Sequence, residues 1–553
     1  MNRVDLIWLG DPENQPTWSL GEVWPTHPTP AAIHRMVREK LPTSTAQAWL
    51  FWDRALGVPQ EDIILKAMTR PGDLWHAGLR LGMGGLPGLI DFVTPTWMLN
   101  RDPPVDIEAT SWRISLRCCL ISINVLRQMG SVHQEFITLD GSALEMGHRY
   151  VKYGVITRYL PWLFSHNLPS LNSFIIFEDE LRFIYYRFGR SWAKWALMRA
   201  FITKYASFRT LIKSWRKIGH SPRTPNPSPL IHVHPPHPLS TTKSKVSVLI
   251  PTLDRYDYLR NLLRQIQHQT IKPFEIIIID QTSKAKRDYD LINDFSELPL
   301  TIIYLDRPGQ CSARNAGLKI IKGDLVLFVD DDDEVTPQLI ENHLDNLRQF
   351  NADASSGVAH EIGAGPLPSD FTLIRASDVF PTNNTLLYRR VLERSGLFDL
   401  AYDKGVRADG DLGMRIYLSG ALMVLNPEIP VLHHRAPKGG LRMHKARVIT
   451  YASSRRYLNQ RHLPSKTEIY LAKRYFTSQQ VREDWWLSAL GTFSIRGSWV
   501  RKGLKILIGI LLLPHTCKQI KICNQDADLM LLGYPKISWF SSSYNKESRA
   551  DEY

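Results

Sequence analysis

The sequence predicts an α/β fold in which helices cover a sheet of mostly parallel strands. Two short runs of β-branched and apolar residues, 246–253 and 325–329, end abruptly at polar side chains, as buried parallel strands do. Apolar residues at helical spacing follow the first run, between Leu259 and Ile266. An acidic segment, Asp330 to Asp333, follows the second run, and ligands of such sheets bind at this end of the strands.

The other elements of this region alternate as expected for one half of a nucleotide-binding sheet. A second apolar strand, 274–279, ends at Asp280-Gln281-Thr282-Ser283, and a third, 300–305, leads into a helical segment at 309–317. Neither GxGxxG nor GxxxxGK[ST] occurs in this stretch. Phosphates would therefore be bound by a metal ion and side chains, not by a glycine-rich loop.

The acidic strand end predicts a cation site. Four adjacent carboxylates, Asp330 to Asp333, repel one another unless a cation or solvent neutralises them. Oxygen-rich clusters of this kind suit Mg²⁺ or Mn²⁺ bound to a diphosphate. The alternative is a solvated turn between strand and helix, with an aspartate as N-cap.

Five short motifs follow one another in order between about residues 246 and 440. They are Val-Leu-Ile-Pro-Thr (248–252), Ile-Ile-Ile-Asp-Gln-Thr-Ser (277–283), Ala-Arg-Asn-Ala-Gly (313–317), Phe-Val-Asp-Asp-Asp-Asp (328–333), and Ser-Gly-Leu-Phe-Asp (395–399) with Asp-Gly-Asp-Leu-Gly-Met-Arg (409–415). Together they resemble glycosyltransferase family 2, the inverting enzymes with the GT-A fold. One departure is Ala408, where many members carry glutamate. The resemblance implies a mixed sheet sandwiched by helices.

The resemblance also implies a reaction and roles for named residues. A sugar would pass from a nucleotide-diphosphate donor of UDP, GDP or dTDP type to a hydroxyl acceptor. A divalent ion, Mg²⁺ or Mn²⁺, held by Asp330 and Asp332 would neutralise the leaving diphosphate. Asp409 would be the general base, with Asp411 as a second catalytic carboxylate; capping of a helix start is the alternative for both. The implied substrate-binding residues are Pro251, Thr252, Asp254, Asp280, Arg314, Asp330 and Arg415.

Two histidines follow the predicted catalytic helix. One of the pair His433-His434 is a candidate metal ligand, and we assign this role to His434. The alternative is ordinary loop polarity.

The N-terminal half repeats part of the same pattern. At one constant offset along the chain, Val125-Leu126, Gly130, Arg149 and Gly154 match Val391-Leu392, Gly396, Arg415 and Gly420. Upstream, Leu50-Phe51-Trp52-Asp53 is similar to Leu327-Phe328-Val329-Asp330. We infer that residues 1–180 form a degenerate GT-A-like α/β domain; chance similarity of two α/β segments is the alternative.

This first domain lacks the predicted catalytic carboxylates. Asp53-Arg54-Ala55 stands where the second domain has Asp330-Asp331-Asp332, and Ala143 stands where it has Asp409. An arginine in place of a carboxylate removes a metal ligand and adds repulsion. The sequence therefore predicts that the N-terminal domain is catalytically inactive.

A basic, aromatic segment, 181–218, connects the halves. No Asp or Glu occurs from Leu181 to Leu253, whereas this stretch carries thirteen Lys or Arg. From Phe188 onward large apolar residues recur every three or four positions, which predicts an amphipathic helix. Such a helix suits an anionic membrane surface. Packing against its own domains, with Lys and Arg extending to solvent, is the alternative.

The remaining domain boundaries follow from composition. We expect a Pro-rich linker at 219–245, the catalytic domain at 246–445, a basic helical region at 446–540 and a flexible tail at 541–553. The apolar run Leu504–Leu513 is shorter than the roughly 20 residues that cross a bilayer. It is predicted to be an interfacial or packed helix.

Cysteine content and charge restrict the compartment and the partners. The five cysteines are odd in number and lack a framework spacing, which favours the cytoplasm. The localised basic segments favour peripheral attachment to the inner face of a membrane. The net charge of +14 comes without a nucleic-acid recognition motif, so nucleic acid is not an expected partner.

The predicted function is a metal-dependent inverting glycosyltransferase of polysaccharide biosynthesis. A glycan, a lipid-linked saccharide and a small molecule remain open as acceptors. Two alternatives remain: a non-catalytic scaffold that binds a nucleotide, and a nucleotidyltransferase. Residues 250–256 lack the glycine-rich, basic first loop that is usual in the latter.

Overall fold

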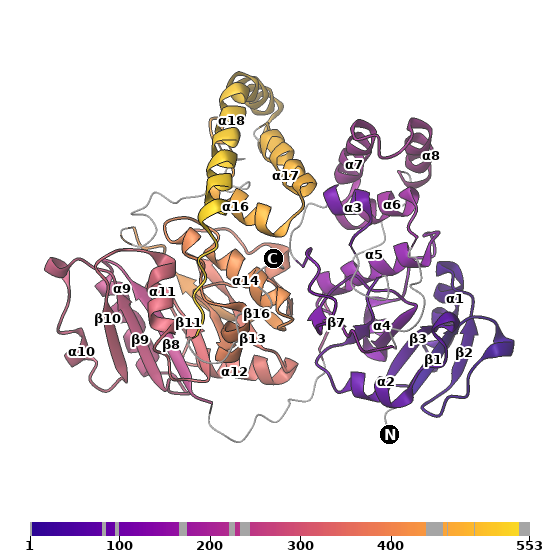
Figure 1. Ribbon diagram of the computed structural model, residues 1–553, viewed down its shortest axis with the longest axis horizontal. Helices are drawn as coiled ribbons and strands as arrows, with labels where there is room; N and C mark the ends of the chain where they lie inside the picture. Colours follow the sequence, from indigo (N-terminus) through magenta and orange to yellow (C-terminus); the bar gives the residue numbers. More distant parts are fainter. Residues whose placement is uncertain are drawn as a thin grey trace.

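The computed structural model describes residues 3–79, 85–93, 99–164, 174–219, 227–232, 244–437, 439, 457–461, 463–491 and 493–540. Two α/β domains lie side by side, each built on one sheet, and helices extend from the same side of both (Figure 1). The predicted fold class, α/β with a mixed sheet between helices and a helical C-terminal region, is confirmed. Most of the predicted linker 219–245 and all of the predicted tail 541–553 lie outside the described residues.

The second domain contains a nine-stranded mixed sheet in the order β10-β9-β8-β11-β15-β13-β16-β12, with β14 paired to β16. Strands β10, β9, β8 and β11 are parallel, β15 is antiparallel to both neighbours, and β13 is parallel to β16. The strands are β8 (Val246–Thr252), β9 (Glu275–Asp280), β10 (Leu300–Tyr304), β11 (Leu325–Phe328), β12 (Asp333–Glu334), β13 (Ala354–Glu361), β14 (Arg375–Ala376), β15 (Thr385–Tyr388) and β16 (Met423–His433).

Helices cover both faces of this sheet. They are α9 (Tyr256–Gln267), α10 (Leu291–Asp294), α11 (Gln310–Leu318), α12 (Leu339–Phe350), α13 (Arg389–Ser395) and α14 (Ala408–Leu418). Ile276 and Ile278 of β9 pack into one core with Leu259 of α9, whereas Ile277 and Ile279 pack into the other with Leu318 of α11. Successive side chains of a strand point to opposite faces, so a strand covered on both sides is apolar throughout.

The first domain contains a seven-stranded sheet in the order β2-β1-β3-β6-β4-β7-β5. Its strands are β1 (Val4–Leu9), β2 (Val23–Thr26), β3 (Ala48–Asp53), β4 (Leu74–His76), β5 (Ala109–Thr110), β6 (Cys118–Ser122) and β7 (Thr157–Tyr159). Its helices are α1 (Pro30–Lys40), α2 (Glu61–Met68), α3 (Gly88–Val93), α4 (Ile123–Met129) and α5 (Leu139–Lys152).

The two sheets have the same topology. β2-β1-β3-β6-β4-β7 corresponds strand by strand to β9-β8-β11-β15-β13-β16, with the same parallel and antiparallel pairs. A short antiparallel strand is added to the last strand in each case, β5 on β7 and β14 on β16. The equivalent helices α4 and α13 end at Gly130 (φ 68°) and Gly396 (φ 74°), a left-handed conformation that glycine adopts without strain.

The domains contact each other through equivalent elements. A Cβ on Gly154, after α5, would lie 2.7 Å from the carbonyl oxygen of Ile374, next to β14. A Cβ on Gly420, after α14, would lie 2.3 Å from the carbonyl oxygen of Glu108, next to β5. The packing is therefore reciprocal, as between two subunits related by a two-fold axis.

In the part of the chain that the structure describes, three helices follow the last core strand of each domain. They are α6 (Phe177–Phe188), α7 (Arg190–Ile202) and α8 (Phe208–Ile218) in the first domain, and α16 (Lys466–Tyr475), α17 (Ser478–Gly491) and α18 (Trp499–Gly533) in the second. After α18 the chain returns to the second domain, where Ile537 bridges to Asp399. By length and apolar composition, α18 is the one helix in the described part of the chain that would be long enough to cross a membrane.

The helix predicted from Phe188 exists as α7, but it buries its small residues and not the large apolar residues that an amphipathic helix usually buries. It begins at Arg190, because Gly189 (φ 94°) separates it from α6. The side chains buried in α7 are Ala193, Ala196, Arg199 and Ala200, whereas Met198 and Ile202 are exposed. The small residues face the protein because they allow close approach of α6.

Candidate functional site

A pocket of about 240 Å³ lies at the carboxyl ends of β8, β9 and β11, where the sequence predicted a ligand site. Its wall is formed by these residues: Pro251, Thr252, Leu253, Arg255, Gln281, Pro308, Gly309, Gln310, Arg314, Asp330, Asp331, Asp332, Thr382 and His433. A larger and more open hollow, about 620 Å³, lies beside α9 and β16 and contains none of the predicted site residues. The smaller pocket is therefore the candidate active site.

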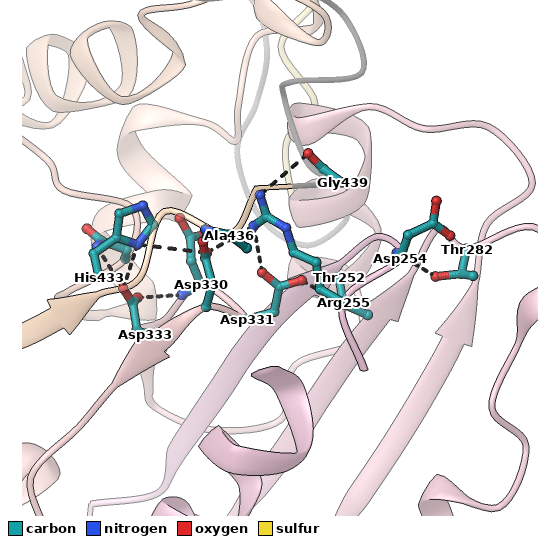
Figure 2. Close-up of polar contacts among 12 residues, drawn as sticks. Thr252, Asp254, Arg255, Thr282, Asp330, Asp331, Asp333, His433, Ala436 and Gly439 are labelled. Atoms are coloured by element: carbon teal, nitrogen blue, oxygen red, sulfur yellow. Dashed lines mark hydrogen bonds and ion pairs between the residues drawn. The ribbon is translucent and has the colours of Figure 1, made fainter. Parts of the chain in front are cut away.

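Each outer carboxylate of the acidic strand end has its own basic partner. Arg314 Nη2 of α11 donates to Asp330 Oδ1 at 2.7 Å, and Asp330 remains partly exposed in the pocket. Asp333 is buried, with Oδ1 2.9 Å from His433 Nδ1 and Oδ2 accepting from the Asp330 backbone N–H (Figure 2). These pairs hold two of the four carboxylates in place.

The two inner carboxylates share one arginine. Arg255 Nη1 lies 2.9 Å from Asp331 Oδ1 (Figure 2). The same nitrogen lies 2.9 Å from Asp332 Oδ1. Asp331 Oδ2 accepts from Thr252 Oγ1, and Asp332 Oδ2 accepts from the backbone N–H of Ala436. Arg255 also donates to the Gly439 carbonyl, so it connects the first strand loop with the segment that follows β16.

Burial and mutual repulsion shift the protonation equilibria of this cluster. Burial raises the pKa of Asp331 to about 7, although Arg255 opposes the shift. Burial also raises the pKa of Asp333 to about 6. For His433 burial acts in the opposite direction, but the hydrogen bond to Asp333 and the neighbouring carboxylates raise its pKa to about 9. Near neutral pH the pocket therefore contains three cations, Arg255, Arg314 and His433, among its carboxylates.

The segment that leads to Asp409 is attached to the pocket wall. Asp403 Oδ1 accepts from the backbone N–H groups of Cys311 and Ser312 at the start of α11. Gln310 Nε2 donates to the carbonyl oxygens of Tyr402 and Gly405. Asp409 itself is exposed in the first turn of α14, and within the described residues it makes no hydrogen bond or ion pair.

Asp411 lies in a different environment from Asp409. It is fully buried, and its carboxylate accepts from Arg415 Nε at 2.9 Å, from Tyr475 Oη at 2.8 Å and from Arg474 Nη1 of α16. Arg415 also donates to the Ser395 carbonyl at the end of α13. These contacts join α13, α14 and α16. Asp411 and Arg415, which were expected to act at the substrate, do not line the pocket.

Comparison with known proteins identifies the region around this pocket. Residues 247–398 match the glycosyl transferase family 2 model. This part of the chain is a family 2 glycosyl transferase domain. The predicted resemblance is thereby confirmed, although the match ends before the segment that carries Asp409.

Individual relatives of the family 2 domain cover limited parts of the chain. An uncharacterised glycosyltransferase of Bacillus subtilis is 39% identical over 98 residues, 18% of this chain and 36% of the relative. A GalNAc(5)-diNAcBac-PP-undecaprenol beta-1,3-glucosyltransferase of Campylobacter jejuni is 32% identical over 122 residues, 22% of this chain and 37% of the relative. The chain thus spans about a third of the length of these two relatives. A solved mannosyltransferase from Pyrobaculum calidifontis, in complex with GDP-Man and Mn2+, is 17% identical with a TM-score of 0.34. The aligned part covers 54% of this chain and 88% of the mannosyltransferase chain.

Two carboxylates of the family 2 domain are of the ligand type that a divalent ion prefers. Asp330 and Asp332 line the pocket and offer the oxygen ligands that Mg²⁺ and Mn²⁺ prefer. Within the described residues no three His, Cys, Asp or Glu side chains form a group that would hold an ion by themselves. An ion would therefore need donor phosphates as further ligands, as is usual for Mg²⁺ in nucleotide sites.

The structure places the other predicted residues of the domain at different distances from the pocket. Pro251 and Thr252 line it, as expected. Asp280 is buried beside it, with Oδ2 accepting from Tyr256 Oη and Oδ1 from the Thr282 N–H. Asp254 is exposed, and its backbone N–H donates to Thr282 Oγ1, away from the acidic cluster (Figure 2).

The two histidines of the predicted pair lie in different environments. His433, not His434, lines the pocket and contacts Asp333. His434 Nε2 lies 2.5 Å from Glu334 Oε1, and its ring packs near Tyr258. His433 is the last residue of β16. Successive side chains along a strand point to opposite faces, so His433 and His434 point in different directions.

Sequence reasoning missed Arg255 and Arg474. Arg255 lies shortly after the first strand motif, at the edge of the sheet where the pocket was predicted, so its position in the sequence indicated a residue of the site. Arg474 belongs to a helix well beyond Asp411 in the chain, and no local pattern links the two.

The contacts of Asp411 with Arg415 and Arg474 form a buried group that we call the clamp. The first domain has an equivalent clamp but lacks the acidic cluster of the pocket. Glu145 accepts from Arg149 of α5 and Arg187 of α6, and Arg149 donates to the Met129 carbonyl at the end of α4. This set corresponds to Asp411, Arg415, Arg474 and Ser395 of the second domain. At the end of β3, by contrast, Asp53 pairs with Arg117 at 2.6 Å.

Proposed function

We propose that this protein is an inverting glycosyltransferase that moves a sugar from a nucleotide-diphosphate donor to a hydroxyl acceptor. The observation that carries the proposal is the pocket at the carboxyl ends of β8, β9 and β11, which combines Asp330 and Asp332 with Arg255, Arg314 and His433 inside a family 2 domain. Such a set binds a diphosphate and a divalent ion together.

In this proposal the cations of the pocket serve the leaving group. As the bond between the anomeric carbon and the diphosphate oxygen breaks, its electron pair goes to the diphosphate, and negative charge develops there. Arg314 and His433 lie where they would stabilise this charge, because both are anchored by carboxylates on the pocket wall. Asp330 and Asp332 would hold a Mg²⁺ or Mn²⁺ ion, which supplies further neutralisation of the diphosphate.

Asp409 is the proposed general base. The acceptor oxygen bonds to the anomeric carbon from the face opposite the diphosphate, and its proton passes to the Asp409 carboxylate. An accessible carboxylate suits this role, and Asp409 is exposed, whereas Asp411 has no accessible surface. Asp411, Arg415 and Arg474 act as positioning residues, because they fix the helix that carries Asp409.

The acceptor proposed is a glycan or lipid-linked saccharide at the cytoplasmic face of a membrane, in polysaccharide biosynthesis. Support comes from the Campylobacter jejuni relative, whose name describes a saccharide on undecaprenyl diphosphate. The described cysteines are all free thiols, as expected for a reducing compartment. A small-molecule acceptor is the alternative.

We further propose that residues 1–180 form a degenerate, catalytically inactive counterpart of the family 2 domain. Support comes from the shared strand order and from the equivalent clamps on Glu145 and Asp411. Ala143 stands at the position of Asp409, and the Asp53–Arg117 pair occupies the strand end that carries the acidic cluster in the second domain.

The decisive experiment is a thermal-shift titration with UDP, GDP and dTDP, each with and without Mn²⁺. One nucleotide should raise the melting temperature in a Mn²⁺-dependent way, since a ligand that binds only the folded state stabilises it. Asp332→Ala should abolish the shift, and Asp53→Ala in the first domain is the matched control that should retain it. Absence of a shift with all three nucleotides would contradict the proposal.

A second measurement separates an enzyme from a nucleotide-binding scaffold. Release of the nucleoside diphosphate from the matching nucleotide sugar should be detectable for the wild type and reduced at least about 100-fold in Asp409→Asn, while nucleotide binding is unchanged. Binding without any release, with or without saccharide acceptors, would favour the scaffold.

A further inference from the structure

Exposed apolar side chains gather on the two helical pairs that leave the sheet domains. On α7, α8 and their connection the exposed set is Met198, Phe201, Ile202, Tyr205, Phe208 and Ile212. On the first half of α18 it is Trp499, Val500, Leu504, Ile506, Leu507, Ile510, Leu511 and Leu513. We call these the first arm (α7–α8) and the second arm (α17–α18). Apolar patches of this extent on a folded chain indicate an interaction surface.

The arms occupy equivalent positions in the two halves of the chain. Each follows a helix whose penultimate residue is an arginine that binds the buried carboxylate of its own domain, Arg187 to Glu145 and Arg474 to Asp411. The arms are therefore fixed to their domains by the same kind of contact, and their exposed faces have a defined orientation.

Within the second arm, α18 has one face against protein and one face without a described contact. Lys505 is buried and donates to the carbonyl oxygens of Tyr457, Leu458 and Gln460, and a Cβ on Gly509 would meet the Phe493 ring. Val500, Leu504, Leu507 and Leu511 lie three or four residues apart and form a stripe on the other side. Leu511 is 72% exposed, and Trp499 is 85% exposed.

The two arms belong to one surface. Arg199 of α7 and Glu483 of α17 form a buried bidentate ion pair, with Nε–Oε2 at 2.8 Å. Gln480 of α17 donates to Asp91 of α3, and α3 contacts α6 and α7. Figure 1 shows both arms on the same side of the molecule, above the two sheets. A flat partner could therefore touch both arms at once.

The segments that carry most of these apolar residues, α7–α8 and the first part of α18, contain basic but no acidic residues. The first arm carries exposed Lys194, Lys204, Arg209, Lys213 and Arg216, and no acidic residue occurs between Leu181 and Leu253. The second arm carries Arg496, Arg501, Lys502, Lys518 and Lys521, again without an acidic residue between Arg496 and Lys521. An apolar surface bordered by lysine and arginine matches the acyl chains and anionic headgroups of a bilayer.

We propose that the two arms together form a bipartite docking surface for an anionic lipid bilayer, with the apolar side chains inserted at the interface. Insertion is preferred to crossing, because the uncharged stretch of α18, residues 506–517, is shorter than the roughly 20 residues that a bilayer core requires. A second copy of this chain fits less well, since its surface would bring the same positive charges together. The inference does not depend on the proposed reaction, because it concerns a surface outside the pocket.

Vesicle co-sedimentation tests the proposal with the full-length protein. The wild type should pellet with vesicles of phosphatidylcholine that contain a minor fraction of anionic phosphatidylglycerol, less with phosphatidylcholine alone, and less at high salt. Phe201→Ser/Phe208→Ser in the first arm and Leu507→Ser/Leu511→Ser in the second should each weaken binding at least about tenfold, because two linked contacts bind with avidity. The matched control is Val58→Ser/Ile292→Ser, which removes two exposed apolar side chains of the sheet domains and should bind like the wild type.

Two results would overturn the proposal. One is vesicle binding that is unchanged when both arms are altered. The other is a dimer, seen by light scattering without lipid, that the arm variants convert to a monomer, because the arms would then cover each other in two copies. Nucleotide-dependent thermal shifts of the same variants should equal those of the wild type, so a failure of the docking surface and a failure of the proposed reaction are distinguishable.

Discussion

Arg255 Nη1 lies 2.9 Å from Asp332 Oδ1 and at the same distance from Asp331 Oδ1, so one guanidinium pairs with both inner, buried carboxylates of the acidic strand end. Three cations of the protein itself, Arg255, Arg314 and His433, thus offset most of the charge of four consecutive aspartates. This relationship leads to the first of four predictions.

Replacement of Arg255 by glutamine should destabilise the fold by about 3 kcal/mol at pH 8, because it leaves buried carboxylates without a cation. The loss should shrink at pH 5.5, since the pKa of Asp331, already raised to about 7 by burial, lies above this pH and the carboxyl becomes neutral. Urea unfolding at the two pH values measures this. Arg260→Gln in α9, the helix that follows Arg255, is the control; the partners of Arg260 are Asp288 and Asp294. An equal loss at both pH values would contradict the assignment.

Asp409 and Asp411 should respond in opposite ways to the same substitution. Asp409→Asn should change the free energy of unfolding by less than about 0.5 kcal/mol, because the side chain is exposed, yet lower kcat about 100-fold or more. Asp411→Asn should cost about 3 kcal/mol of stability, because Arg415 and Arg474 lose their buried counter-charge. Chemical denaturation and donor turnover, measured on both variants, test this pair. Normal stability of Asp411→Asn would remove its positioning role.

The equivalent carboxylate of the first domain should affect stability without affecting the chemistry. Glu145→Gln removes the charge that Arg149 and Arg187 share, and we expect a loss of about 3 kcal/mol. Donor turnover per folded molecule should stay within twofold of the wild type, because the proposed base lies in the other domain. If turnover fell as far as in Asp409→Asn, the first domain would not be catalytically inactive.

Glu180 should make stability depend on pH. Its carboxylate is buried and accepts from the N–H groups of Leu89 and Ile90 and from Tyr205 Oη, and burial raises its pKa to about 7. Because the pKa of Glu180 is higher in the folded than in the unfolded chain, where it is about 4.5, the protonated carboxyl favours the folded state. This contribution to the free energy of unfolding is complete below pH 4.5 and is lost as the pH rises to about 7. Glu180→Gln should therefore flatten the stability profile between pH 5 and 8, by up to about 3 kcal/mol. Urea midpoints across this range measure it, and a profile of unchanged slope would refute the assignment.

Much of the second domain could be predicted from the sequence because its strands are covered on both faces and its turns carry polar motifs. The strand ends at Thr252, Asp280 and Phe328 meet at one edge of a parallel sheet, so the pocket followed from the order of the elements. The clamp on Asp411 did not, because Arg474 belongs to a helix far along the chain. The pairing of His433 rather than His434 depends on the phase of β16 at its last residue, which local spacing does not determine.

By itself, the sequence determined the fold class, the family 2 domain and the pocket residues at the strand ends, Pro251, Thr252, Asp330 and Asp332, since periodicity and motif order are local properties. Tertiary structure alone decided which carboxylates are accessible and that Arg255 lies between Asp331 and Asp332. It also decided that Met198, Phe201 and Ile202 of α7 are exposed. It also decided that both arms lie on one side of the molecule. The physical reason is that burial and charge pairing depend on contacts between segments distant in the chain, and such contacts leave no periodic signal in either segment.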